Sequence, residues 1–365
     1  MVAVHQFVPT LAPRDAVSGH YMRVRTALRA AGYASDIYAM DARGELAKEA
    51  KPFQTFRGGR SGEPTWLCYH SSIGSPIAEF VAERPEPLIV DYHNITPAKF
   101  FARWEPGVAV YLRAGRRQLR GLAPRTALGI ADSAYNAAEL DGLGFRPTGV
   151  VPILFDRDDL HVDIDEAVRD RLLSEKTAGS STWLFVGQVA PHKAQHDIVK
   201  ALASYRRVFD PNARLRIVGF ALSRSYTRAL QSYVDDLGLT DVVDIAGSVP
   251  DEVLGAYYAT ADVYVCLSEH EGFCVPLLEA MHHGVPVVAY AAGAVPETLG
   301  SGGLLLEKKD PLTVATAVAH VMNGSGSEPM RATLARAGRA RLDSFDLAKG
   351  EARLRDAIAS VAGTP

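Results

Sequence analysis

Short apolar runs alternate with longer amphipathic stretches along almost the whole chain of 365 residues. The short runs are rich in Val, Ile, Leu and aromatic residues, which is typical of buried strands, whereas the longer stretches have helical spacing. Buried strands separated by helices indicate parallel sheets with helices on both faces. The expected strands include 2–4, 65–69, 87–90, 127–131, 183–186, 214–218, 242–245, 263–267 and 285–289, and the expected helices include 19–31, 109–122, 195–208, 225–237 and 250–259.

The alternation weakens between residues 150 and 181, where Pro152 and several aspartates precede a polar segment. Because a chain of this length commonly folds as two domains, we expect an α/β fold of two Rossmann-like, doubly wound domains. Ligands would then bind at the carboxyl ends of the strands, in a cleft between the two halves. The expected parts are an N-terminal domain of residues 1–155, a linker of 156–180, a C-terminal domain of 181–346, and a last helix within 347–365 that packs back across the domains.

The balance of charge excludes some classes of partner. Lys and Arg number 39 against 42 Asp and Glu, and this net charge of −3 disfavours a nucleic-acid-binding protein, which normally has a basic excess. No apolar run reaches the ~20 residues that a membrane span needs, and the N-terminus lacks the pattern of a secretory signal. The three cysteines lack CxxC spacing, so we expect no metal site, no disulfide framework and a cytoplasmic protein.

The stretch that follows the expected strand 263–267 carries the strongest functional signal. Gly272 lets the backbone approach a ligand closely, and Pro276 stands where the first turn of a helix favours proline. The backbone amides and the positive end of the helix dipole would form an anion site there. Glu271 and Glu279 have carboxylates that only accept hydrogen bonds, which suits the hydroxyl pairs of a hexose or a ribose. The combination indicates a nucleotide sugar.

A second stretch has a complementary pattern. The strand expected at 183–186 ends at Gly187, and Lys193 stands just before a helix, where its ammonium can meet the charge of a diphosphate. Taken alone, this residue would more often be a solvent-facing loop lysine. His192 and His196 have no third ligand nearby in the sequence, so we interpret them as surface or packing residues.

These two stretches together resemble glycosyltransferase family 4, the retaining group 1 glycosyltransferases of the GT-B fold. The resemblance rests on two glutamates eight positions apart with Gly-Phe between them, and on the Phe-Val-Gly…Lys segment. It implies two Rossmann-like domains facing across a cleft. It also implies transfer of a sugar from a nucleoside-diphosphate-sugar donor to an acceptor hydroxyl of a cell-envelope glycan, a glycolipid or a small metabolite. Neither a metal nor another cofactor is expected.

The resemblance also implies roles for individual residues. Lys193 would bind the donor diphosphate, Glu279 the ribose hydroxyls and Glu271 the donor sugar. Gln188 stands where the family usually has an arginine, and either Arg14 or Arg157 could supply the missing charge. The implied catalytic residues are Glu271, Lys193 and His93, and the implied donor-binding residues are Gly187, Gln188, Lys193, Gly272, Phe273, Cys274, Val275, Glu279 and Val249.

The N-terminal half is less diagnostic. His93 occupies the place of a family histidine that lines the donor sugar, although a core histidine bonded to a backbone carbonyl is the alternative. Residues 9–19 are expected to form a loop that borders both substrates, with a helix beginning near His20, although Ser18 acting as a helix N-cap also explains this pattern. For Ser133 we prefer a capping role. The expected acceptor-side loop residues are Asp15, Ser18 and Gly19.

Other functions remain open on the sequence alone. A non-hydrolysing nucleotide-sugar epimerase has a similar two-domain architecture, and a non-catalytic sugar-nucleotide or glycan-binding subunit would fit the unusual Gln188. The cluster of arginines at 113–125 is better explained as a solvated helix face, although it is also compatible with peripheral contact at the inner membrane face. A nicotinamide dehydrogenase is disfavoured because no GxGxxG follows a strand.

Overall fold

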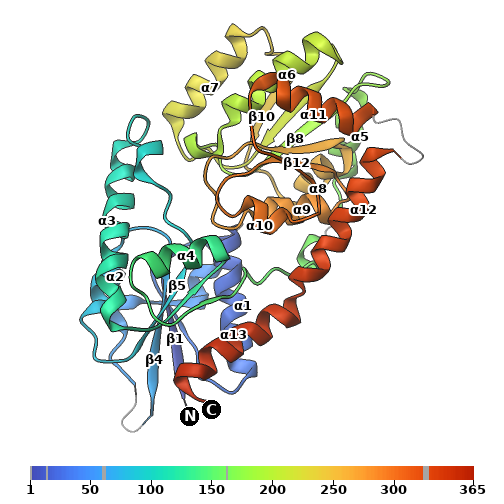
Figure 1. Cartoon of the computed structure of the whole chain (residues 1–365). Coiled ribbons are helices and arrows are strands. Elements are labelled where there is room, and N and C mark those ends of the chain that lie inside the picture. The colour runs from blue at the N-terminus through green and yellow to red at the C-terminus, as the bar shows by residue number, and fades with distance from the viewer. Residues whose placement is uncertain (1, 14, 60–62, 162, 324–328) are drawn as a thin grey trace. The chain divides into compact units, whose positions relative to one another are not determined.

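The computed structural model describes residues 2–13, 15–59, 63–161, 163–323 and 329–365, and the chain forms two α/β units (Figure 1). Unit 1 consists of Met1–Ala102, Pro106–Phe155 and Phe345–Pro365, and unit 2 consists of Arg103–Glu105 and Asp156–Ser344. Unit 1 is therefore built from both ends of the chain.

Unit 1 has a parallel sheet with the strand order β3-β2-β1-β4-β5-β6-β7 among the described residues. Its chain order reverses between β1 and β4, which pair with each other through registers such as Phe7↔Tyr69. The strands are β1 (Ala3–Leu11), β2 (Ile37–Ala42), β3 (Ala50–Pro52), β4 (Thr65–Ser71), β5 (Leu88–Tyr92), β6 (Thr126–Ala131) and β7 (Thr148–Val150). The helices are α1 (Ala16–Ala30), α2 (Pro76–Ala82), α3 (Pro106–Leu122), α4 (Ala134–Gly142) and α13 (Leu347–Ala362).

Unit 2 repeats the plan with the strand order β10-β9-β8-β11-β12-β13, again parallel. A large apolar core around Trp183 and Val263 covers the sheet. The strands are β8 (Thr182–Val186), β9 (Arg214–Val218), β10 (Val243–Gly247), β11 (Val263–Cys266), β12 (Val287–Tyr290) and β13 (Leu304–Leu306). The helices are α5 (Glu166–Ser174), α6 (Gln195–Val208), α7 (Arg224–Asp236), α8 (Asp251–Thr260), α9 (Val275–His282), α10 (Val295–Leu299), α11 (Pro311–Asn323) and α12 (Met330–Leu342).

The prediction of two doubly wound parallel sheets is confirmed, but the expected loop at residues 9–19 is wrong at its start. Strand β1 continues through Pro9 to Leu11. Backbone amides along β1 point alternately to its two neighbours in the sheet. The Val4 amide donates to Ala34 on the side of β2, and the Ala3 amide donates to Pro64 on the side of β4, so the odd-numbered amides of β1 face β4. The paired registers of β1 with β4 end at Phe7. Pro9 has no N–H group, but its nitrogen lies on the β4 side beyond the last pair, so no hydrogen bond between the two strands is lost.

The first helix also begins earlier than expected, at Ala16 instead of near His20. Its cap is Asp15, not Ser18, because the Asp15 carboxylate accepts from the Ser18 amide at 2.9 Å and also suits the positive end of the helix dipole. The Ser18 hydroxyl donates to Asp15 at 2.7 Å and accepts from the Ala12 amide at 3.0 Å. Ser133 caps α4 as expected, by accepting from the Asn136 amide at 3.2 Å.

Two segments outside the sheets also have definite places. The residues 156–180, expected as a linker, contain α5 and lie in unit 2. The last helix, α13, lies in unit 1, where Leu354 and Ile358 are fully buried in a cluster with Val4 and Val24.

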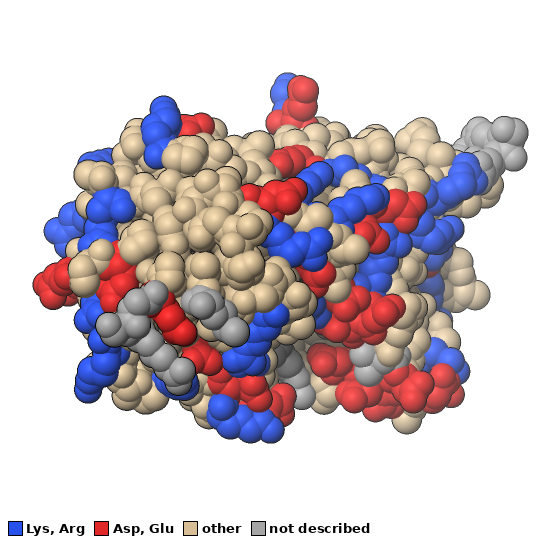
Figure 2. Space-filling model, turned by 90° about the horizontal axis from the view of Figure 1, so that it is seen from below, with Lys and Arg blue, Asp and Glu red and all other residues tan. Residues whose placement is uncertain are grey.

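No helix in the described part of the chain is both long and apolar enough to cross a membrane. On the face shown in Figure 2, Lys and Arg side chains lie among Asp and Glu side chains around a broad uncharged area. Mixed charge of this kind agrees with the small net charge of the chain.

Candidate functional site

The most informative residues of unit 2 follow β8 and β11. These strands are neighbours in the sheet, and the chain order reverses between them, since β9 lies beyond β8 and β12 beyond β11. Ligands of open α/β sheets bind outside the carboxyl ends of strands at such a reversal. The fold therefore brings together two loops that are far apart in the sequence.

The loop after β8 begins at Gly187, whose φ of 145° lies in a region that favours glycine. Its amide donates to the Val218 carbonyl at 2.9 Å, which holds the start of the loop beside β9. Gln188 is exposed, and its carbonyl accepts from the Gln195 side chain at 2.8 Å. A short 3-10 turn, Pro191–Lys193, then delivers the Lys193 side chain.

The two loops are joined by direct contacts. The Glu269 amide donates to the His192 carbonyl at 2.8 Å, and the Lys193 ammonium lies 2.8 and 2.7 Å from the two carboxylate oxygens of Glu271. The side chains of Lys193 and Glu271 are 17% and 6% exposed. Burial alone would lower the pKa of Lys193, but the Glu271 carboxylate raises it above its usual value. The lysine is therefore a fixed cation, paired with Glu271, which is also expected to act in catalysis.

Helix α9 begins beside this pair, with Pro276 in its first turn as expected. The cap residue Cys274 has a left-handed conformation, with φ of 76°, which turns the chain sharply into the helix. The first N–H groups of a helix have no partners within the helix, and they carry the positive end of its dipole. Gly272 and Val275 are half-buried, and Phe273 is buried with its carbonyl accepting from the Thr298 hydroxyl at 2.6 Å.

Gly293 shapes the same loop but was not among the residues expected in the site. The amide of the next residue, Ala294, donates to the Glu271 carbonyl at 2.9 Å. A Cβ on Gly293 would lie 2.4 Å from that carbonyl oxygen and 2.9 Å from the Glu271 nitrogen, and the residue has φ of 57°. The backbone at Glu271 is therefore placed by the absence of a side chain at Gly293. A single glycine before a short helix is too common a pattern to have indicated this contact.

Glu279 lies within α9, and its carboxylate accepts from the Tyr258 hydroxyl at 2.7 Å. The side chain is half-buried, and burial raises the pKa of Glu279 above its usual value. Tyr258 fixes the position of this carboxylate and was missed from the sequence, where nothing distinguishes it from a core tyrosine. Val249 is half-buried in the segment after β10.

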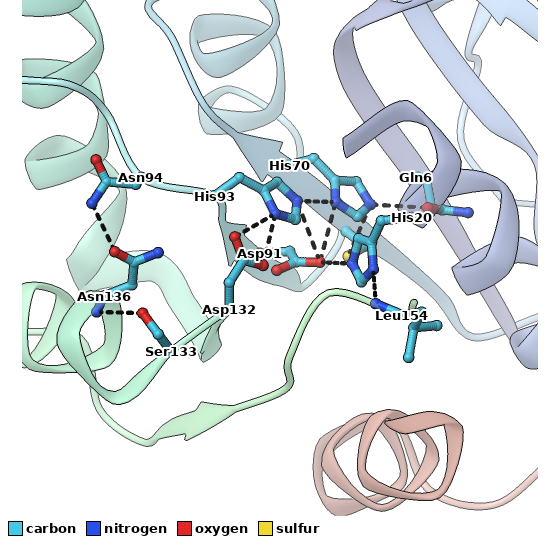
Figure 3. A network of polar contacts seen from close by, with 11 residues as sticks. Gln6, His20, His70, Asp91, His93, Asn94, Asp132, Ser133, Asn136 and Leu154 are labelled. Carbon is cyan, nitrogen blue, oxygen red and sulfur yellow. Dashed lines mark hydrogen bonds and ion pairs between the residues drawn. The ribbon is translucent and has the colours of Figure 1, made fainter. Parts of the chain in front are cut away.

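His93 follows β5 in unit 1, and its ring lies within a buried network of polar side chains (Figure 3). Its Nδ1 lies 2.9 Å from Asp132 Oδ1, and its Nε2 lies 2.9 Å from His70 Nδ1. Burial alone would lower the pKa of His93, but the carboxylates of Asp132 and Asp91 raise it to about 9. Burial lowers the pKa of His70 to about 4, so the neutral His70 accepts from a protonated His93. The role of His93 at a donor sugar stays a prediction.

The other expected residues of unit 1 lie at the start of α1. Asp15 is its cap, Ser18 is buried in its first turn, and Gly19 follows in the same turn. Of the two arginines considered as replacements for the missing cation, Arg14 lies outside the described residues. Arg157 donates to the Leu342 carbonyl at 2.8 Å and to the Asp343 carboxylate at 3.0 Å.

Two groups of potential metal ligands occur among the described residues. One consists of Cys266, Glu271 and Cys274, and the other is the network in unit 1 formed by His20, His70, Asp91 and His93. In the first group the Lys193 ammonium already neutralises Glu271, so a metal ion there would meet an adjacent positive charge.

Comparison with known proteins shows what this part of the chain is similar to. Residues 170–341 match the family model described as glycosyl transferases group 1. The D-inositol 3-phosphate glycosyltransferase of Geodermatophilus obscurus is 32% identical over 65% of this chain and 54% of the relative. The GDP-mannose-dependent alpha-(1-6)-phosphatidylinositol monomannoside mannosyltransferase of Mycobacterium tuberculosis is 34% identical over 43% of each chain. The chain thus spans about half the length of these curated relatives.

Two solved structures share the fold over nearly the whole chain. Sucrose-phosphate synthase from Thermosynechococcus elongatus superposes with a TM-score of 0.76 at 19% identity, covering 98% of each chain. Anabaena HepE in complex with UDP-glucose superposes with a TM-score of 0.74 at 19% identity, covering 98% of this chain and 99% of that one. Residues 170–341 thus match the group 1 glycosyltransferases, and the two doubly wound units of the chain have the architecture of the GT-B fold.

Proposed function

We propose that this protein is a retaining glycosyltransferase that moves a sugar from a nucleoside-diphosphate-sugar donor to a hydroxyl of a cell-envelope glycan, a glycolipid or a small metabolite. The observation that carries the proposal is the pair formed by Lys193 and Glu271 beside the first turn of α9, where β8 and β11 meet. The names of the compared proteins support a donor of this class, since one relative is GDP-mannose-dependent and one solved neighbour holds UDP-glucose.

In the proposed reaction the bond between the anomeric carbon and the phosphate oxygen breaks while the acceptor oxygen bonds to the same face of the sugar. The hydroxyl proton passes to the leaving diphosphate. Negative charge grows on that diphosphate, and fixed donors stabilise it best when they are already in place. The Lys193 ammonium and the N–H groups at the start of α9 supply such donors, so we assign no metal or other cofactor to this step.

The pairing also suggests how the site changes when the donor binds. Glu271 neutralises Lys193 in the structure. A donor diphosphate would compete for the ammonium, while the sugar hydroxyls would donate to the carboxylate of Glu271. Lys193 and Glu271 would then give up their ion pair, and each would contact a different part of the bound donor. We assign acceptor binding to unit 1, where Asp15, Ser18 and Gly19 follow β1 at the reversal between β1 and β4.

A thermal-shift screen with UDP, GDP, ADP and TDP tests the donor class. One nucleotide should raise the melting temperature well above the others, because a bound ligand stabilises by RT ln(1 + [L]/Kd), about 2.7 kcal/mol at 100 times Kd. The matching nucleotide sugars are then incubated without acceptor and the products analysed. An epimerised sugar in this incubation would indicate an epimerase. A donor that binds but is transferred to no acceptor in later assays would indicate a binding subunit. If no nucleotide raised the melting temperature, the proposal would be contradicted.

Glu279→Gln is expected to weaken nucleoside diphosphate binding about 10- to 100-fold, the loss typical of one hydrogen bond to a charged group. The carboxylate is held by Tyr258 and is proposed to accept from the ribose hydroxyls. Calorimetry should compare each nucleotide with its 2′,3′-dideoxy analogue. The wild type should prefer the ribonucleotide, and Glu279→Gln should show a much smaller preference.

Tyr258→Phe is the matched control for this experiment, because it removes the hydroxyl but keeps the carboxylate that is proposed to contact ribose. It should lose less affinity and keep its preference for the ribonucleotide. If Glu279→Gln still preferred the ribonucleotide as strongly as the wild type does, the assignment of Glu279 to the ribose would be wrong.

We also propose that the protein works in the cytoplasm, with contact at the inner membrane face when the acceptor is a lipid. Cys68, Cys266 and Cys274 are buried free thiols, which suits a reducing compartment.

A further inference from the structure

Two buried thiols lie beside the pair formed by Lys193 and Glu271, and their sulfurs take no part in the proposed reaction. Cys266 is the last residue of β11, and Cys274 is the cap of α9. The two residues are 1% and 7% exposed, and both thiols are free. Their sulfurs and a carboxylate oxygen of Glu271 all lie within 4.8 Å of one another. The loop that carries Glu271 therefore begins and ends at a cysteine, and the two sulfurs are neighbours.

Cys274 occupies a position that would suit glycine. Its φ of 76° and ψ of 64° are left-handed, and a side chain other than that of Asn or Asp rarely adopts this conformation. Among the described residues other than glycine, only Asn94, Ala194 and Cys274 have a positive φ. Residues with such strained backbones are concentrated at functional sites. Glycine would meet the backbone requirement with less strain, so the chain holds a thiol here despite its backbone.

The two thiols are hydrogen-bonded to each other in one direction. Cys274 donates to Cys266, and this bond lowers the pKa of Cys266 below its usual value and raises the pKa of Cys274. Burial opposes ionisation of both sulfurs. The Ser268 hydroxyl lies 3.4 Å from the Cys266 sulfur and can donate to its thiolate as well. Cys266 is therefore the thiol that ionises first, and the thiolate is the nucleophilic form of cysteine.

We propose that Cys266 and Cys274 are a reversible oxidation site, which forms a disulfide when the chain meets hydrogen peroxide. The Cys266 thiolate attacks one peroxide oxygen, the O–O bond breaks, and the leaving hydroxide takes up the proton that Cys266 had released. The Cys274 sulfur then attacks the sulfenic acid on Cys266, and the S–O bond breaks as the Cys274 proton leaves with the hydroxide as water. Two thiols thus lose two electrons and two protons, and one peroxide becomes two waters. Cytoplasmic disulfides are usually transient, which agrees with a bond that a thiol reductant opens again.

Closing this bond would disturb the proposed donor site. A disulfide holds its sulfurs much closer together than two hydrogen-bonded thiols are. Cys266 is held in the sheet, where it pairs with Ala289 of β12, so Cys274 must move toward it. The first-turn amides of α9 and the backbone at Glu271 would move with it, and a shift of about 1 Å in a catalytic group can cost about 10²-fold in rate. This consequence rests on the proposed function, whereas formation of the disulfide does not.

The test of the disulfide uses the full chain, first reduced and then treated with hydrogen peroxide in the absence of a donor. The intact mass should fall by the mass of two hydrogen atoms, and dithiothreitol should restore it. Cleavage after Glu269 and Glu271 separates the two cysteines, so a cross-linked pair of peptides identifies the bond. Addition of oxygen without this cross-link, or a cross-link to Cys68, would overturn the proposal. The wild type alone decides this point, whether or not the variants fold.

Variants then connect the disulfide with the donor site. Cys68→Ser is the matched control, since Cys68 is also 1% exposed but lies in unit 1. Peroxide should lower donor hydrolysis by the wild type and by Cys68→Ser about 10²-fold, and dithiothreitol should restore it. Cys266→Ser should keep its own untreated rate after peroxide, and neither it nor Cys274→Ser should form the cross-link.

The two readouts fail in different ways. A cross-linked wild type that hydrolyses the donor as fast as the reduced protein would refute the effect on the donor site. Equal loss of activity in Cys266→Ser and the wild type would show that peroxide acts elsewhere and would refute it as well. If the reduced wild type binds no nucleotide, the proposed function is wrong, and a cross-link between Cys266 and Cys274 would still establish the oxidation site.

Discussion

Lys193→Met is expected to turn over the donor about 10²- to 10³-fold more slowly than the wild type, the usual effect of removing one donor that stabilises a growing negative charge. The readout is release of nucleoside diphosphate during hydrolysis of the donor, in which water takes the place of the acceptor hydroxyl, so the acceptor need not be known. The variant should also unfold more easily. Glu271 is 6% exposed and would lose its partner, and breaking a buried ion pair from one side typically costs about 3–5 kcal/mol.

The double variant Lys193→Met/Glu271→Gln separates these two effects. It removes both charges together, so most of the lost stability should return in chemical denaturation, while turnover should stay low. Recovery of turnover along with stability would mean that the lysine acts only as a structural partner of Glu271. Normal turnover by a folded Lys193→Met protein would contradict the proposed mechanism.

Gly293→Ala is expected to reduce donor turnover about 10²-fold, although residue 293 needs no contact with the ligand. The new Cβ would lie 2.4 Å from the Glu271 carbonyl oxygen, so the backbone at Glu271 must move. A shift of about 1 Å in a catalytic group can cost about 10²-fold in rate. Overpacking of this kind also destabilises by about 1–3 kcal/mol. Steady-state kinetics and denaturant unfolding of the same preparation measure both effects.

Gly284→Ala is the matched control. Gly284 also has a left-handed backbone, with φ of 68°, but the Cβ there would meet only the end of the flexible Arg339 side chain, at 2.7 Å. It should lose some stability and keep wild-type turnover. Equal loss of turnover in both variants would show that backbone strain, not the contact with Glu271, is responsible.

The half of the chain that carries local motifs could be predicted in most of its detail. A strand, a glycine and a first-turn proline lie close together in the sequence, and α9 begins beside Pro276 as that order requires. Short strands near the sheet edges, such as β3 and β13, were missed because three residues carry little periodic signal. The start of α1 was misplaced because Asp15 competes with Ser18 for the capping position.

Contacts between distant residues could not be predicted in the same way. The sequence places Lys193 and Glu271 in loops that follow two separate strands, and only the pairing of β8 with β11 brings these loops together. The cluster around Asp91 has no recognisable spacing, because its histidines come from three segments that meet only in the folded sheet. Short ligand motifs can be recognised in a sequence, whereas a cluster assembled by the topology of the sheet cannot.

The composition of unit 1 has a consequence for synthesis on the ribosome. Domains usually fold in the order in which they emerge, the N-terminal one first. Here the N-terminal sheet lacks the buried Leu354 and Ile358 until α13 has been translated, whereas all of Asp156–Ser344 emerges earlier. The nascent chain can therefore complete its second unit before its first, and the early strands must wait, with an apolar face uncovered, for the last helix.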